Sequence, residues 1–166
     1  MNVIDFVPQY SKMLKNLDHW LDKAEEHAKA KKFDVETLVH ARLAPDMYSL
    51  DRQIQSACDT AKFSAAYLSG KEAPAHPDTE KTIAELRARI RSCRAFLETV
   101  TSADGAEERR VAPKWMQGKW AKGGEFLVQM SLPNFYFHVT TAYAILRHNG
   151  VDVGKQDFIG GMALHD

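Results

Sequence analysis

Apolar residues recur at three- and four-residue steps through four long stretches of this 166-residue chain, and this periodicity most constrains its fold. Side chains with that spacing share one face of an α-helix. Each such helix needs a partner to cover its apolar face, so we expect an all-α four-helix bundle that forms a single domain, residues 1–166. The predicted helices cover residues 5–30, 46–69, 79–100 and 125–149.

The segments between the predicted helices limit the order of helix directions. The first and third connections are long, whereas the second, a polar stretch that ends near Asp78, is short. Long first and third connections permit crossovers, so an up-up-down-down order stands beside the simple antiparallel one. Trp115 and Trp120 flank Gln117 and Gly118 before the fourth helix, which predicts a small hairpin or an ordered loop there.

Composition argues against several classes of protein. The formal net charge is zero, with 22 basic and 22 acidic residues, so neither nucleic acid nor a membrane surface is an expected partner. No apolar run approaches the ~18 residues of a membrane span, and the acids and proline among the first residues are not the pattern expected of a cleavable signal. Cys58 and Cys93 fall among apolar positions and are expected to be buried thiols of a cytoplasmic protein. The alternating arginines of residues 87–94 predict a solvated helix face.

The strongest candidate site lies on the fourth predicted helix, where Asn134 and His138 are one helical turn apart. Thr141 follows three residues later on the same face. A neutral imidazole binds divalent metals and titrates near neutral pH, so His138 is the candidate catalytic residue. The alternative is a core histidine whose only role is a hydrogen bond to a neighbouring group.

Two polar residues near the second helix are candidates to complete this site. Gln53 borders the buried face, three residues after Leu50, and could hydrogen-bond across the bundle to His138 or hold water in a pocket. Asp46 comes at the start of the helix, where it would either cap the helix or lie at the rim of the pocket. The candidate ligand-binding residues are therefore Asn134, Gln53, Asp46 and Thr141.

Three blocks of the sequence are ARLAPDMYSL, RQIQSACD and LPNFYFHVTTAYAILRHNGVDVGKQDFIG, at residues 41–50, 52–59 and 132–160. They resemble a bacterial family of uncharacterised proteins in the DinB/YfiT-like superfamily of metalloenzymes. The resemblance implies a DinB-like four-helix bundle with up-up-down-down order, often a homodimer. Superfamily members with known activity include metal-dependent thiol transferases and a mycothiol-dependent maleylpyruvate isomerase.

The resemblance also implies a metal site that this chain keeps only in part. Similar proteins hold the metal with three histidines, one on the second helix and two spaced four residues apart on the fourth. His138 keeps its position and its distance to Leu146, Arg147 and Gly150, but the earlier ligand position holds Asn134 and the second helix has no histidine. A carboxamide is a weak ligand, so zinc or nickel is disfavoured as a cofactor and His138 is the one strong ligand left.

Three functions are compatible with these patterns. The favoured one is small-molecule binding in a polar central pocket that lacks the full three-histidine metal site. The alternatives are an enzyme similar to the metal-dependent thiol transferases, and a non-catalytic dimeric scaffold whose polar cluster is a buried network. The aromatic run Phe135-Tyr136-Phe137 covers three faces of its helix, which suggests core packing or, for a homodimer, a subunit interface.

Overall fold

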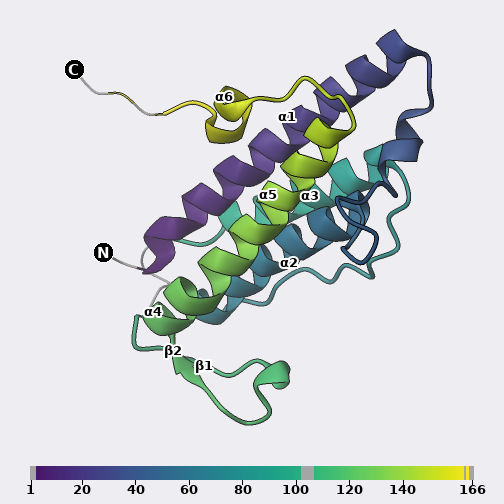
Figure 1. The fold of residues 1–166 in the computed structure, drawn as a ribbon. Coiled ribbons are helices and arrows are strands. Elements are labelled where there is room, and N and C mark those ends of the chain that lie inside the picture. Colours follow the sequence, from purple (N-terminus) through teal and green to yellow (C-terminus); the bar gives the residue numbers. More distant parts are fainter. Residues whose placement is uncertain (1–2, 102–106, 163, 165–166) are drawn as a thin grey trace.

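The computed structural model describes residues 3–101, 107–162 and 164, and within them the fold is helical apart from one small sheet (Figure 1). The four long helices are α1 (Val7–Lys31), α2 (Leu50–Ser69), α3 (Ile83–Glu98) and α5 (Leu132–His148). The shorter elements are α4 (Gly123–Phe126), a π-helical turn (Leu127–Ser131), α6 (Lys155–Ile159), and 3-10 turns at Val3–Phe6, Val35–Leu38 and Lys114–Met116. The predicted all-α four-helix bundle is confirmed. None of the described helices combines the length and apolarity that crossing a membrane requires.

The predicted hairpin before the last long helix is also confirmed. β1 (Arg110–Val111) pairs antiparallel with β2 (Ala121–Lys122), and Figure 1 shows this hairpin projecting from one end of the bundle. α4 and the π-helical turn then run without a break into α5, where Pro133 occupies the first turn. Proline has no N–H to donate, so it suits a first turn and the loosened helix that precedes it.

The helix directions differ from the expected up-up-down-down order. α1 and α5 run in one direction and α2 and α3 in the other, so the order is up-down-down-up (Figure 1). The reason is the connection of residues 70–82, which carries no helix and returns the chain along the length of the bundle between α2 and α3. The contacts that establish these directions are Tyr10–Phe135, Trp20–Tyr143, Gln53–His138, Thr60–Asn134, Gln55–Arg89, Cys58–Cys93, Ser11–Arg94 and Asp18–Arg87.

Local sequence sets the starts of α2 and α3, but Asp46 is not a capping residue. Thr82 accepts a hydrogen bond from the Glu85 N–H at 3.2 Å, and the Glu85 carboxylate accepts one from Thr82 N–H at 3.1 Å. This capping box starts α3. α2 starts after Ser49, so Asp46 does not cap it; Asp46 lies exposed in the turn of the loop that precedes the helix.

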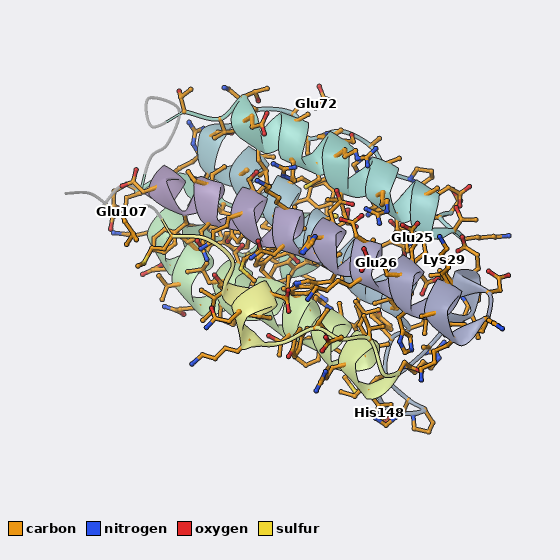
Figure 2. The ribbon with its side chains drawn as sticks, turned by 90° about the horizontal axis from the view of Figure 1, so that it is seen from above. Glu25, Glu26, Lys29, Glu72, Glu107 and His148 are labelled. Carbon is orange, nitrogen blue, oxygen red and sulfur yellow. The ribbon has the colours of Figure 1, made fainter. Side chains whose placement is uncertain are left out.

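The core lies where the four long helices meet, and α6 covers its outer side. Figure 2 shows α1 between α3 and α5, with α6 lying across α1 and α5. The buried Trp20 ring stacks on Phe158 at 5.5 Å and donates to the Asp157 carbonyl oxygen at 3.1 Å. Cys58 and Cys93 are buried free thiols, as expected, and Cys93 Sγ donates to the Cys58 carbonyl oxygen.

Candidate functional site

His138 and Gln53 meet across the interface between α5 and α2. His138 Nδ1 lies 2.8 Å from Gln53 Oε1, and Gln53 Nε2 donates to the Tyr48 carbonyl oxygen at 3.1 Å. Because Gln53 uses its amide N–H₂ on Tyr48, its Oε1 is the acceptor and His138 Nδ1 carries the proton. The predicted hydrogen bond across the bundle is therefore present, and it selects one tautomer of His138.

In this tautomer His138 Nε2 is unprotonated and has a lone pair that can accept a hydrogen bond. Within the described part of the chain, no hydrogen-bond donor reaches it. Burial lowers the pKa of His138 below its ordinary value of 6.5, which favours the neutral ring at neutral pH. His138 is thus oriented by Gln53 and is able to accept a proton or a hydrogen bond through Nε2.

Asn134 makes a different contact one turn earlier on α5. Its Nδ2 donates to Thr60 Oγ1 at 2.7 Å, and the Thr60 hydroxyl donates to the Ser56 carbonyl oxygen. The Asn134 Oδ1 atom remains available as an acceptor. Thr141, by contrast, donates to the Phe137 carbonyl oxygen of its own helix, so its hydroxyl is already engaged. The structure brings together Gln53 with His138 and Thr60 with Asn134, and Asp46 makes neither contact.

A cavity of about 260 Å³ opens between α2 and α5 beside Asn134. Its walls combine hydroxyl, amide and carboxylate groups with large aromatic rings; the residues used below are Thr60, Phe63, Ser64, Tyr67, Trp115 and Asn134. His138 and Gln53 are not among its lining residues; His138 lies one helical turn after Asn134 on α5. Polar groups set among aromatic rings are typical of small-molecule sites.

Ser64 is the unexpected residue of this cavity. Its side chain is 1% exposed, and its hydroxyl makes no hydrogen bond of acceptable geometry within the described residues, although the Tyr10 hydroxyl is near. Tyr10 instead pairs with Ser131 at 2.8 Å, and burial raises the pKa of Tyr10. Since buried hydroxyls are almost always paired, the Ser64 hydroxyl is a group that a ligand or a water could satisfy.

These donors do not fit the metal that the superfamily resemblance implies. Gln53 Oε1 is occupied by His138, so the available ligand atoms are His138 Nε2 and Asn134 Oδ1. One imidazole and one carboxamide are fewer and weaker than the three strong ligands that zinc or nickel sites use. Nor does the described part of the chain bring three His, Cys, Asp or Glu side chains together in a metal-binding cluster.

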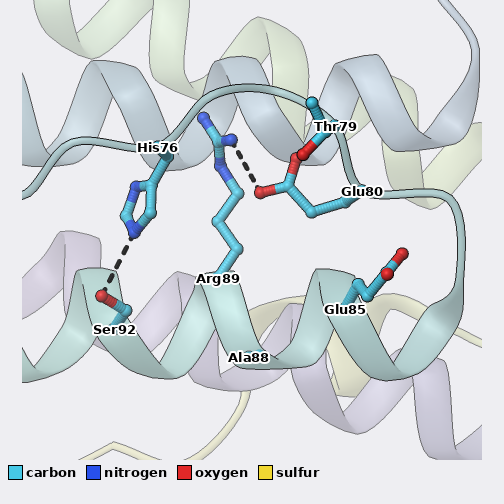
Figure 3. Close-up of a pocket in the computed structure, with 7 residues that line it drawn as sticks. All are labelled: His76, Thr79, Glu80, Glu85, Ala88, Arg89 and Ser92. Carbon is cyan, nitrogen blue, oxygen red and sulfur yellow. Dashed lines mark hydrogen bonds and ion pairs between the residues drawn. The ribbon is translucent and has the colours of Figure 1, made fainter.

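A second polar cluster lies on the other side of α2, centred on Arg89 (Figure 3). The Arg89 side chain is 1% exposed, and its guanidinium lies 2.6 Å from Asp59, 2.6 Å from Asp78 and 2.9 Å from Glu80. The expectation that the arginines of residues 87–94 form a solvated face is wrong for Arg89. Its helix face is covered by the 70–82 connection, which supplies two of the three carboxylates.

His76 joins this cluster but is not placed to act as a base toward Ser92. Its Nδ1 lies 2.8 Å from the buried Lys62 Nζ, and its Nε2 lies 3.1 Å from Ser92 Oγ (Figure 3). An ammonium group only donates, so Nδ1 is the acceptor and Nε2 carries the proton toward Ser92. The imidazole therefore has no lone pair with which to activate the Ser92 hydroxyl, and the cluster acts as a structural link between α2, α3 and their connection.

The lowered pKa values of His76 and His138 predict that the fold loses stability in acid. Burial, together with Lys62 and Arg89, lowers the pKa of His76, and burial lowers that of His138. The unfolded chain therefore takes up protons first as pH falls below about 6.5, and stability is lost from there down to the folded pKa values. Each histidine contributes at most about 1.4 kcal/mol per pH unit.

Urea unfolding at pH 8, 7, 6 and 5 measures this effect. The unfolding midpoint should fall between pH 7 and 5, and the fall should be smaller in the His76→Gln/His138→Gln variant. A further loss is expected at lower pH, because burial opposes ionisation of Asp78 and Glu80 but their bonds to Arg89 outweigh it and lower both pKa values. A midpoint that is constant or higher at pH 5 would contradict the assignment.

Comparison with known structures defines the class of protein. The bundle superimposes with a TM-score of 0.92 on the crystal structure of a DinB family member protein from Shewanella denitrificans. The two sequences are 49% identical, and the match covers 96% of this chain and 92% of the other. The fold is therefore that of a DinB-like helical bundle, as the sequence resemblance implied.

The family follows from the sequence itself. Residues 5–159 match the family described as Domain of unknown function (DUF1993), and the chain belongs to this family. A search of curated proteins found no match. The family and the DinB-like resemblance are thus confirmed.

Proposed function

We propose that this protein binds a small organic molecule in the cavity between α2 and α5, without a resident metal ion. The observation that carries the proposal is the buried Ser64 hydroxyl, which makes no hydrogen bond of good geometry within the described residues and lines a cavity that also presents Asn134 and Thr60. Leaving a buried hydroxyl unpaired costs about 1–3 kcal/mol. A ligand that hydrogen-bonds to the Ser64 hydroxyl would remove this cost, which is a physical reason to expect a ligand here.

The aromatic residues support an organic ligand. Phe63 and Tyr67 stack with ring centroids 6.3 Å apart, and the Trp115 side chain, 58% exposed, closes the cavity from the hairpin. Phe63 is also 41% exposed, and exposed aromatic side chains that gather at a cavity are typical of a ligand-binding surface. In this proposal Gln53 is a positioning residue that holds the His138 ring. A ligand that extends from the cavity toward His138 would meet its Nε2 atom, which can accept a hydrogen bond or a proton.

Binding of the neutral fluorescent probe N-phenylnaphthylamine tests the proposal. We expect saturable 1:1 binding to the wild-type protein and at least about tenfold weaker binding to Asn134→Leu, because leucine fills the cavity and removes the amide. Thr140→Leu, an exposed change on the same helix, is the matched control and should bind as the wild type does. Equal affinity for all three proteins would rule out this cavity.

The homodimer stays a prediction. Of the aromatic run, Phe135 is buried against Tyr10, Tyr136 accepts a hydrogen bond from Gln9, and Phe137 is 55% exposed. Phe137 is therefore the residue of the run that a second subunit could cover.

A further inference from the structure

A second hollow, of about 500 Å³, adjoins the first at the end of the bundle that carries the hairpin. The two hollows share Phe63 and Tyr67 as walls, so a molecule that lies over these rings reaches both.

The charged residues that line the second hollow are mostly cationic. Lys71, Arg109 and Arg110 contribute positive charge, against the single carboxylate of Glu72. Arg110 lies over the Trp120 ring, with its guanidinium carbon 5.1 Å from the ring centroid. The hollow is thus a positively charged recess with aromatic walls, in a protein whose formal net charge is zero.

Arg109 is a cation of this recess that forms no ion pair with the described residues. Its Nε is buried and has no hydrogen-bond partner, and no carboxylate of the described residues forms an ion pair with it. The backbone of Arg109 is held next to the hairpin, because its carbonyl oxygen accepts from Gly123 N–H at 2.8 Å. A partly buried guanidinium that lacks an anion is costly, and pairing it with a carboxylate or phosphate recovers that cost.

Gly70 makes room for this side chain. It ends α2 in the left-handed region, at φ 79°, and a Cβ atom there would lie 2.8 Å from Arg109 Nη1. The absence of a side chain at Gly70 lets the Arg109 guanidinium approach the end of α2, where Tyr67 lines the same hollow. Both the end of α2 and the hairpin therefore determine where Arg109 lies.

We propose that Arg109 binds the acidic group, a carboxylate or a phosphate, of the molecule whose body occupies the cavity between α2 and α5. This inference rests on the proposed function and adds the class of ligand. The ligand is an elongated organic acid whose acidic end lies at Arg109, whose apolar body covers Phe63 and Tyr67, and whose polar end meets Asn134 and Ser64.

Two fluorescent probes of similar shape test this assignment. Anilinonaphthalene sulfonate carries an anionic group and N-phenylnaphthylamine does not. We expect the sulfonate to bind the wild type about tenfold more tightly than the neutral probe, and Arg109→Gln to remove that advantage while the affinity for the neutral probe is unchanged. Arg109→Lys should keep part of the advantage, and Arg147→Gln, the same charge change on the exposed end of α5, should keep all of it.

The outcomes separate the two proposals. If the neutral probe does not bind the wild type, the proposed function fails and this inference fails with it. If the neutral probe binds but Arg109→Gln leaves the sulfonate affinity within about twofold, only the acidic-group site is wrong. Urea midpoints of the variants confirm that each is folded, and displacement of the sulfonate by benzoate or by phenyl phosphate distinguishes a carboxylate from a phosphate ligand.

Discussion

Replacing Arg89 with methionine is expected to lower the free energy of unfolding by about 3–5 kcal/mol, the largest loss from any single change considered for this protein. The guanidinium compensates Asp59, Asp78 and Glu80 at distances of 2.6–2.9 Å. Methionine has a similar volume but no charge, so it leaves three carboxylates in a partly buried place, with Lys62 paired to Asp59 and Arg52 paired to Asp78 as the remaining cations.

Urea unfolding at pH 7 measures this loss. Arg91→Met is the matched control, because Arg91 lies on the same helix and is exposed, and it should change stability by no more than about 0.5 kcal/mol. If Arg89→Met and Arg91→Met have equal stability, the cluster does not hold the 70–82 connection against the bundle. A larger loss for Arg89→Met at pH 7 than at pH 4 is also expected, since the carboxylates are partly protonated at the lower pH.

Rebuilding the three-histidine set is expected to create a zinc site. In the Gln53→His/Asn134→His variant, His138 gains two imidazole neighbours, one across the α2–α5 interface and one a helical turn earlier. We expect zinc affinity to rise on the order of 1,000-fold, from weaker than about 1 mM in the wild type to about 1 µM. The physical reason is that imidazole replaces two carboxamides, which are poor ligands for zinc.

Calorimetric titration of untagged protein with zinc measures this gain. Adding His138→Ala to the double variant should abolish it, which separates the designed site from adventitious binding to surface histidines. Micromolar zinc binding by the wild type would show that the incomplete donor set suffices, and the metal-free proposal would then be wrong.

Helix positions could be predicted from the sequence because each long helix carries an apolar stripe at the helical period. The order of helix directions could not. The polar 70–82 connection is short in residues, which suggests a direct turn between neighbouring helix ends. However, 13 extended residues span about 43 Å, and α2, with 20 residues, is about 30 Å long. That segment is long enough to return the chain along α2. It is held there by contacts of the buried Arg89 and Lys62 with its polar side chains.

The candidate site was predictable in part. The Gln53–His138 hydrogen bond followed from a polar residue beside the apolar stripe of α2 and an imidazole on the facing helix. Thr60 and Ser64 were missed, although they continue the same face at seven and eleven residues after Gln53. Arg109 could not be found from the sequence, because its environment depends on a helix end and a hairpin that meet only in the folded chain.

A crystal structure of untagged protein soaked with N-phenylnaphthylamine tests the central claim most directly. The account predicts electron density for the probe between α2 and α5, in contact with Ser64 and Asn134, and no anomalous metal peak at His138 Nε2. A metal peak at His138, or a probe bound elsewhere while this cavity stays without density, would contradict it.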